Sequence, residues 1–186
     1  FSQAVYREAL RMGMATAAKV YVVQDGAVYL WNLFEDRFAK VAQGVLDFYH
    51  ASDHLWALAH ELFGQGSDEA GRWAHKLLHQ LRHGKEKRVV KTLEELMTHT
   101  PPQHAHATEI IENTAQYFTA HKDHIPYSDL AEQGVPIGSG AMESQCSQFQ
   151  NRLKRRGQFW RPTGSGRLLA VIQRAQNGEL HTLWAA

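Results

Sequence analysis

The chain has 186 residues, 44% of them hydrophobic and 21% charged, which is typical of one globular domain with a sizeable core. The formal net charge of +1 does not by itself predict a polyanion partner, and no apolar run reaches the roughly 18 residues of a membrane-spanning helix. The single cysteine, Cys146, excludes an intrachain disulfide and indicates a reducing compartment.

The first third of the chain alternates helical and strand patterns. Apolar spacing predicts helices over residues 4–17, 27–38 and 51–63, and β-branched or aromatic runs predict strands over 19–24 and 45–48. This alternation is typical of a βαβ unit with a parallel sheet. Asp25 and Asp47 each close one of the two apolar runs, and open α/β sheets carry their reactive groups beyond the carboxyl ends of the strands.

The middle third of the chain is predicted to be helical. Residues 64–125 carry no strand pattern and contain three helical patterns. Ser67 is placed to cap the first helix and Gly84 to end it, the proline pair 101–102 stops the second, and the third surrounds residues 110–118. An all-helical block therefore separates the second strand from the C-terminal third of the chain.

A glycine-rich loop runs into a helix at residues 134–144, which read Gly-Val-Pro-Ile-Gly-Ser-Gly-Ala-Met-Glu-Ser. Ser139 is placed to cap this helix, and Glu143 lies in its first turn. Glycines allow a backbone to approach a ligand closely. The loop is therefore a candidate ligand-binding element.

Basic residues follow on the same helix and on the last helix, which is predicted to start at Pro162. The candidate DNA-binding residues are Arg152, Lys154, Arg155, Arg156, Arg161 and Arg167. No Asp or Glu interrupts the segment from residue 152 to residue 174. Such a local excess of positive charge indicates phosphate contacts.

Asp25, Asp47 and Glu143 are chemically suited to hold divalent cations beside a phosphodiester, provided that the fold brings them together. Each also has an ordinary structural explanation. Asp25 with Gly26 is a common turn dipeptide, Asp47 could cap the next helix, and Glu143 could complement a helix dipole.

Histidines recur every four residues at His75, His79 and His83, and again at His50 and His54. Histidines at this spacing can bind zinc. The stripe over residues 75–83, however, has no cysteine and is flanked by basic residues that oppose a cation. A solvated or DNA-facing stripe is therefore favoured over a structural zinc site.

Three segments carry a family resemblance. They are residues 22–27 with 30–32 (Val-Val-Gln-Asp-Gly-Ala, Leu-Trp-Asn), 46–50 with 54–56 (Leu-Asp-Phe-Tyr-His, His-Leu-Trp), and 136–144 with 152–154 (Pro-Ile-Gly-Ser-Gly-Ala-Met-Glu-Ser, Arg-Leu-Lys). Together they resemble the Mutator-like branch of the bacterial insertion-sequence DDE transposases, in the expected order and over nearly the whole chain. The glycine-rich motif before the glutamate is the most specific part.

The resemblance implies an α/β fold with a partial RNase H-like core and an all-helical insertion before the last catalytic carboxylate. On that basis residues 1–63 form the partial core, 64–133 the helical insertion, and 134–186 the Glu143 helix and C-terminal helix that complete the core. This organisation agrees with the helical block that the residue pattern predicts independently.

The resemblance also implies site residues. Asp25 matches the family's second catalytic aspartate and Glu143 its catalytic glutamate, so both would bind Mg²⁺ or Mn²⁺, with two ions in the full-length enzyme. Asp47 and His50 match the Asp-x-x-His signature that lies near the site in this branch. The family's first catalytic aspartate has no counterpart, because the only acidic residue before Asp25 is Glu8, in a helical pattern.

We therefore expect the C-terminal part of a transposase that cleaves and transfers DNA strands with divalent metal. Its partners would be insertion-sequence ends, target duplex and further copies of itself, with no membrane, in the bacterial cytoplasm at the nucleoid. Two alternatives stay open: a catalytically inactive remnant that binds DNA or a partner, and another RNase H-like nuclease. With two of three carboxylates, the isolated chain is expected not to cleave DNA.

Overall fold

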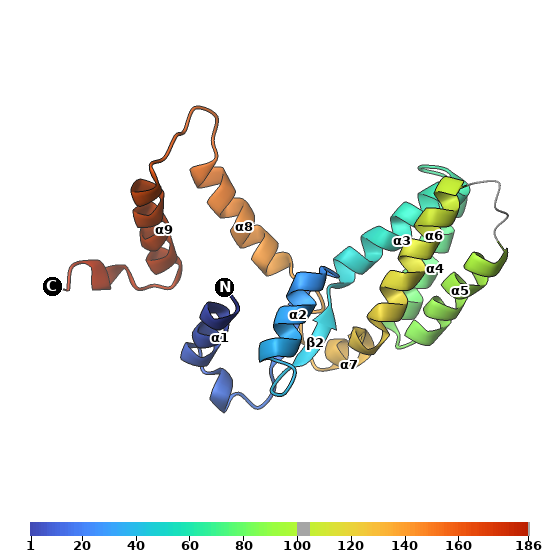
Figure 1. Cartoon of the computed structure of the whole chain (residues 1–186), viewed down its shortest axis with the longest axis horizontal. Helices are drawn as coiled ribbons and strands as arrows, with labels where there is room; N and C mark the ends of the chain where they lie inside the picture. Colours follow the sequence, from blue (N-terminus) through green and yellow to red (C-terminus); the bar gives the residue numbers. More distant parts are fainter. Residues whose placement is uncertain (100–104, 186) are drawn as a thin grey trace. The chain divides into compact units, whose positions relative to one another are not determined.

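The computed structural model describes residues 1–99 and 105–185, and the chain divides into two compact units, residues 1–139 and 140–186. It is mostly helical with a small parallel sheet, a mixed α/β structure (Figure 1). Among the described helices, none combines the length and the apolar character needed to cross a membrane. The proline pair 101–102, predicted to end a helix, lies outside the described residues.

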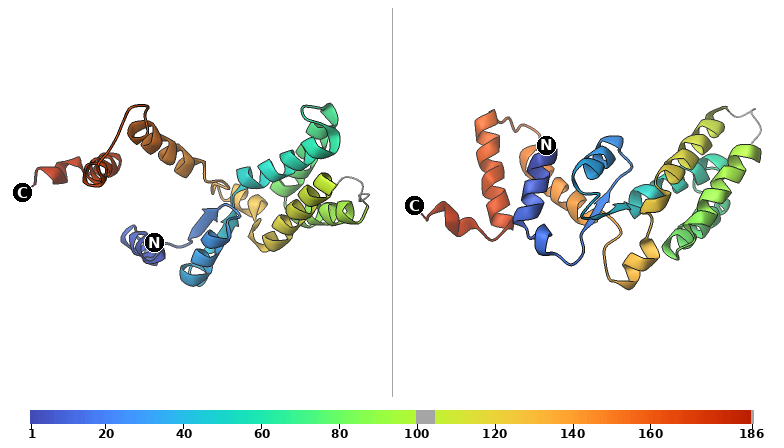
Figure 2. Two further views of the ribbon diagram at one scale, coloured as in Figure 1. Left: turned by 45° about the horizontal axis from the view of Figure 1, so that its top comes forward. Right: turned by 60° about the horizontal axis from the view of Figure 1, so that its bottom comes forward.

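The first unit contains the sheet. Strands β1 (Tyr21–Gln24) and β2 (Gln43–Leu46) run parallel and are joined by helix α2 (Val28–Arg37), as the strand–helix alternation predicts (Figure 2). Their register pairs Gln24 with Leu46, so the strands end side by side. The second strand ends earlier than predicted, because Asp47 already caps the next helix.

The N-terminal helix is shorter than the pattern 4–17 predicts. Helix α1 (Ser2–Arg11) is followed by a separate 3₁₀ turn, η1 (Met14–Thr16). The break lies at Gly13, whose φ of 93° is in the left-handed region that favours glycine. The prediction missed this break because the apolar spacing continues across the glycine.

Helices α3 (Phe48–Phe63), α4 (Asp68–Arg82), α5 (Glu86–His99) and α6 (Ala105–Ala120) form a bundle beside the sheet (Figure 1). The predicted cap of α4 is confirmed, because the Ser67 hydroxyl accepts a hydrogen bond from the Ala70 N–H at 3.1 Å. A 3₁₀ turn, η2 (Lys122–His124), and helix α7 (Tyr127–Glu132) come next. The sequence pattern did not predict α7, which is too short to show a helical period.

One continuous hydrophobic core joins the sheet to the bundle. Fully buried side chains from both include Val45, Leu46, Leu55, Leu58, Leu77, Leu81, Leu93, Phe118 and Tyr127. The outer edge of β2 is closed by the segment after α6. His124 Nδ1 lies 3.2 Å from the Gly44 carbonyl oxygen, and the Tyr127 hydroxyl donates to the Leu46 carbonyl oxygen at 2.9 Å. These contacts fix the helices against the carboxyl end of the sheet.

The second unit consists of α8 (Gly140–Leu153), α9 (Pro162–Gln176) and the 3₁₀ turn η3 (Leu180–Leu183). Helix α9 begins at Pro162, as predicted. The Trp160 indole N–H donates to the Leu153 carbonyl oxygen at 2.9 Å and closes the loop between α8 and α9. Among the described residues of this unit, Ile172 is the only one that is buried.

Candidate functional site

Two of the predicted site residues lie at one edge of the sheet. Asp25 follows the last residue of β1, and Asp47 follows the last residue of β2. The Asp47 N–H donates to the Gln24 carbonyl oxygen at 2.8 Å, so the ladder continues to the aspartates. Asp25 and Asp47 are therefore the next residues of adjacent parallel strands, the position where α/β sheets carry reactive groups.

Asp47 is fully buried, and the hydrogen bonds that the structure describes for its side chain come from the first unit. Oδ1 accepts the N–H of Tyr49 at 2.7 Å and of His50 at 3.1 Å, and Oδ2 accepts the N–H of Ser139 at 2.5 Å. Burial alone would raise the pKa of this carboxyl, but the hydrogen bonds from Ser139, His50 and Tyr49 outweigh burial and hold the pKa below its usual range. Asp47 is therefore an ionised clamp between the start of α3 and the glycine-rich loop.

The glycine-rich loop reaches Asp47 because Gly138 has no side chain. A Cβ at this position would lie 2.5 Å from Cδ2 of the Tyr49 ring, closer than any real contact. The neighbouring Ile137 carbonyl oxygen accepts the Phe48 N–H at 2.9 Å. The close approach that the sequence assigned to a ligand is, at Gly138, an approach to a protein side chain.

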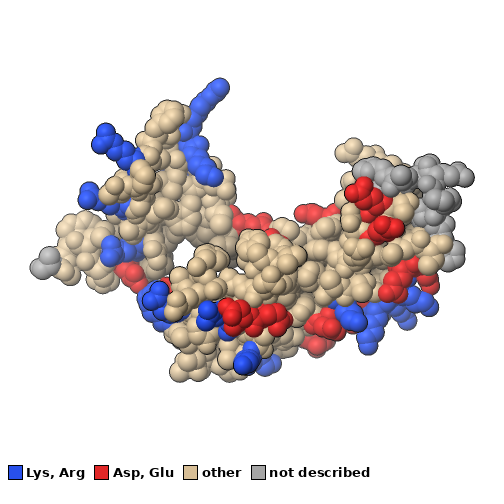
Figure 3. All heavy atoms as spheres, viewed as in Figure 1, with Lys and Arg blue, Asp and Glu red and all other residues tan. Residues whose placement is uncertain are grey.

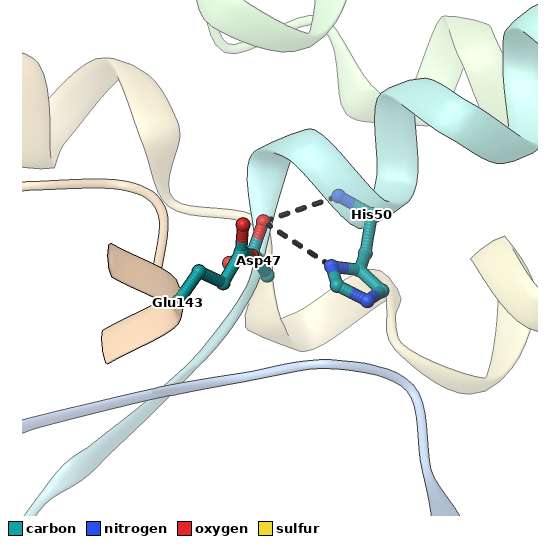
Figure 4. A group of neighbouring side chains, drawn as sticks. All are labelled: Asp47, His50 and Glu143. Carbon is teal, nitrogen blue, oxygen red and sulfur yellow. Dashed lines mark hydrogen bonds and ion pairs between the residues drawn. The ribbon is translucent and has the colours of Figure 1, made fainter. Parts of the chain in front are cut away.

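His50 completes the Asp-x-x-His pair within the first turn of α3. Its Nδ1 lies 3.9 Å from Oδ1 of Asp47, and the same oxygen accepts its backbone N–H (Figure 4). The His50 side chain is 46% exposed, whereas the Asp47 side chain is 0% exposed. A helix cap explains the spacing of this pair.

Asp25 is half-buried and offers more to a cation than Asp47 does. Its Oδ1 accepts the Ala27 N–H at 2.8 Å, and its carbonyl oxygen accepts the Trp31 indole N–H at 2.9 Å. These bonds confirm the predicted Asp-Gly turn. From the residues that the structure describes, Oδ2 accepts no hydrogen bond. One such carboxylate oxygen fits Mg²⁺, which uses few protein carboxylates and completes its shell with water and substrate oxygens.

Side chains from α3 and α6 cover the edge around Asp25. The Tyr117 ring lies directly against Gly26, where a Cβ would overlap it. It stacks on the His54 ring with centroids 4.0 Å apart and meets the His121 ring edge-on at 5.2 Å. Sequence reasoning missed Tyr117 and His121, because their helix pattern does not say which distant turn they pack against.

The groups around this edge are held neutral. Burial raises the pKa of Tyr117, and the negative charges of Asp25, Asp47 and Asp53 raise it further. Burial and nearby His50 lower the pKa of His54, although Asp53 opposes them. At neutral pH these side chains therefore surround the carboxylates as uncharged donors and acceptors.

His121, which directly follows α6, is neutral for the same reason. Burial lowers its pKa first, and the neighbouring His124 lowers it further. A hydrogen bond to the Gly26 backbone raises the pKa but does not outweigh burial. The ring stacks on Trp31 at a centroid distance of 4.9 Å, so it is fixed between α2 and the Asp25 turn.

The remaining predicted residues belong to the second unit. Glu143 lies in the first turn of α8, as predicted, and its distance from Asp25 stays a prediction. The candidate DNA-binding residues are all exposed: Arg152, Lys154, Arg155, Arg156, Arg161 and Arg167. Figure 3 shows the Lys and Arg side chains of the whole chain in blue. Nε of Arg155 donates to the Asn151 carbonyl oxygen at 2.8 Å.

Two other features lie away from these aspartates. A surface cavity of about 480 Å³ lies at the start of the strands, where Lys19 and Tyr21 both donate to Gln133. At the end of α4, the ring of His79 lies 4.2 Å from that of His83, the residue that follows the helix. Ring packing therefore accounts for part of the histidine stripe, and its proposed contact with DNA stays a prediction.

Comparison with curated proteins and with solved structures finds no match to the chain. A family model does match, over residues 12–183, a range that includes the sheet, the helical bundle, the glycine-rich loop and α9. Its description is that of an uncharacterised family and carries no activity. The chain thus belongs to the uncharacterised protein family UPF0236.

Proposed function

We propose that the chain is part of a DDE transposase that cleaves DNA and joins the freed end to a target with divalent metal. The observation that carries this proposal is the edge of the sheet. Asp25 and Asp47 end adjacent parallel strands, and Asp47 anchors the glycine-rich loop through Ser139. The β1–α2–β2 unit would be part of an RNase H-like core, with the helical bundle as its insertion.

Chain length supports a role for Glu143 at the same edge. Ser139 is anchored on Asp47, and Glu143 comes four residues later, which limits its Cα to within about 14 Å of the Ser139 Cα. Asp25 and Glu143 would bind Mg²⁺ or Mn²⁺. Asp47, saturated with hydrogen bonds, would instead position the loop that delivers Glu143.

The proposed reaction is DNA hydrolysis followed by strand transfer. Two bound divalent cations, when present, activate the attacking oxygen and stabilise the leaving oxygen. In hydrolysis, water attacks phosphorus and releases a 3′-hydroxyl. In strand transfer, that hydroxyl attacks a target phosphodiester and displaces a target 3′-oxygen. Asp25 and Glu143 supply the negative charge that holds the cations beside the phosphate.

The second unit would bind the DNA backbone. Its exposed basic residues fall within a segment without acidic residues, which suits contact with phosphates irrespective of sequence. Insertion-sequence ends and target duplex are the DNA partners that we propose. Assembly of several copies on paired ends, at the bacterial nucleoid, belongs to the same proposal.

A specific observation favours a second candidate for the isolated chain, a DNA-binding remnant without catalysis. Before Asp25 the only acidic residue is Glu8, on α1. Its carboxylate pairs with Arg11 at 2.7 Å on an exposed helix face. Glu8 is therefore no substitute for a third carboxylate at the sheet edge.

A strand-cleavage assay separates the two candidates. Residues 1–186 and the full product of the reading frame that contains them are each incubated with labelled duplex in Mg²⁺ or Mn²⁺. We expect no cleavage by residues 1–186 and cleavage by the longer protein. Cleavage by residues 1–186 would show that a further aspartate is not required.

Two substitutions in the longer protein test the glutamate. Glu143→Gln should abolish cleavage while DNA binding persists, because it keeps the shape and removes the charge. Glu179→Gln, the matched control at the other acidic residue of the second unit, should cleave normally. Robust cleavage by Glu143→Gln would remove this residue from the mechanism.

A further inference from the structure

The hydroxyl of Tyr117 is buried and, among the described residues, has no hydrogen-bond partner. Its ring cannot move away easily, because it is held between Gly26 and the stacked ring of His54. A buried hydroxyl without a partner is costly and rare in folded proteins. The described protein atoms therefore leave this hydroxyl free to pair with a group that enters from outside the chain.

The surroundings define what kind of ligand this is. The Tyr117 ring lies against Gly26, the residue that follows Asp25, so its hydroxyl belongs to the turn that carries this carboxylate. A phenol hydroxyl is protonated at neutral pH, so it can donate a hydrogen bond. The oxygens of Asp47 are already taken by N–H groups, and Asp25 does not accept from Tyr117. The missing partner is therefore an acceptor oxygen that enters beside Asp25.

We propose that the Tyr117 hydroxyl donates a hydrogen bond to an oxygen, from water or from a phosphate, that is coordinated to a divalent cation at Asp25. This inference rests on the proposed metal site and adds a residue from the helical insertion to it. It also explains why position 26 is a glycine, since only a glycine lets the Tyr117 ring reach the turn that carries Asp25.

Tyr127 provides a matched control within the same unit. It is buried, and its hydroxyl donates to the Leu46 carbonyl oxygen at 2.9 Å. A Tyr→Phe change at either position removes one oxygen and keeps the ring. The two variants therefore differ in whether the protein itself uses the hydroxyl.

The first measurement is thermal unfolding without metal. Tyr127→Phe should lower the midpoint by about 2–4 °C, as expected for a lost hydrogen bond in a chain of this size. Tyr117→Phe should leave the midpoint unchanged or raise it. A fall as large as that of Tyr127→Phe would show that the Tyr117 hydroxyl is paired within the protein, which overturns the proposal.

The second measurement is Mn²⁺ binding to residues 1–186, monitored by calorimetry or electron paramagnetic resonance. Tyr117→Phe should weaken Mn²⁺ binding about tenfold, the usual effect of losing a partner of a metal ligand, and Tyr127→Phe should not. Equal Mn²⁺ affinity of wild type and Tyr117→Phe, with and without phosphate, would overturn the proposed role of Tyr117 but not the proposed metal site. Absence of Mn²⁺ binding by the wild-type chain would overturn the proposed metal site and this inference with it.

Inorganic phosphate distinguishes the two sources of the oxygen. If the partner is a metal-bound water, the tenfold difference should be present without phosphate. If it is a phosphate oxygen, the two proteins should bind Mn²⁺ equally without phosphate and differ once phosphate is added. Equal affinity in both conditions counts against the proposal.

Discussion

The two units of this chain differ in charge and in burial. Seven of the twenty basic residues and two of the nineteen acidic residues lie in residues 140–186, which gives that unit a formal charge of +5 and the first unit −4. The first unit has a continuous core from α2 to α7, whereas the described part of the second buries only Ile172.

This difference leads us to propose separate tasks for the units. Residues 140–186 have one buried side chain among those that the structure describes, so this unit has little core of its own. A first unit with a complete core can hold carboxylates and their neighbours in fixed positions. We therefore expect changes in the first unit to affect folding and metal binding, and changes in the second to affect DNA binding.

The largest effect on stability is expected at Asp47. Replacing it with Ala leaves the N–H groups of Tyr49, His50 and Ser139 without their acceptor, which should cost about 3 kcal/mol. Asp47→Asn, the matched control, keeps one acceptor oxygen and should cost less. Urea unfolding monitored by circular dichroism measures both, and an Ala variant as stable as wild type would show that the clamp is not needed.

The largest effect on DNA binding is expected from the basic run of the second unit. Replacing Arg152, Lys154, Arg155 and Arg156 with Ala should reduce the slope of log affinity against log salt by about 3.6. The matched control replaces Lys85, Lys87, Arg88 and Lys91 of the first unit and should leave the slope unchanged. Equal slopes for the two quadruple variants would break the division of tasks between the units.

A smaller stability effect is expected from Gly26→Ala. The new Cβ would overlap the Tyr117 ring, so this variant should lose about 1–3 kcal/mol. Gly71→Ala on α4 is the matched control, because a Cβ there meets no atom within 4 Å and alanine favours helix. It should gain up to about 1 kcal/mol. Equal effects of the two changes in chemical unfolding would mean that Tyr117 does not press on the Asp25 turn.

The smallest effect is a loss of stability on acidification in two steps. His54 and His121 have lowered pKa values when folded, so the stability that they contribute is present above about pH 6.5 and lost as the pH falls through the lowered values. Asp47 contributes stability above about pH 3.9, which is lost as the pH falls through its lowered folded pKa. Unfolding free energies measured from pH 7 to pH 3 should show both losses.

Variants assign each step to its residues. His54→Phe with His121→Phe should reduce the upper step, and Asp47→Asn should reduce the lower one. An upper step of unchanged size in the double histidine variant would contradict this assignment.

The sequence predicted those parts of the fold that depend on local patterns. The runs before Asp25 and Asp47 formed parallel strands, and Ser67 and Pro162 begin the helices that they were expected to begin. Local patterns did not predict α7, which is too short to have a period, or the early end of β2 at the Asp47 cap.

The candidate site shows the same limit. The predicted strand ends placed Asp25 and Asp47 at the carboxyl edge of the parallel sheet. Two features of the site depend on contacts between residues far apart in the chain. The Ser139 N–H donates to Asp47, and the Tyr117 ring packs on Gly26. No spacing rule predicts such contacts, because they are set by how the helical bundle packs on the sheet.

The central claim is that Asp25 and Glu143 both bind divalent cations, and Mn²⁺ binding to residues 1–186 tests it most directly. We predict that Asp25→Asn and Glu143→Gln each weaken binding at least about tenfold. Glu61→Gln, at an exposed acid on α3, should bind as wild type does. Wild-type Mn²⁺ affinity in both Asp25→Asn and Glu143→Gln would contradict the account.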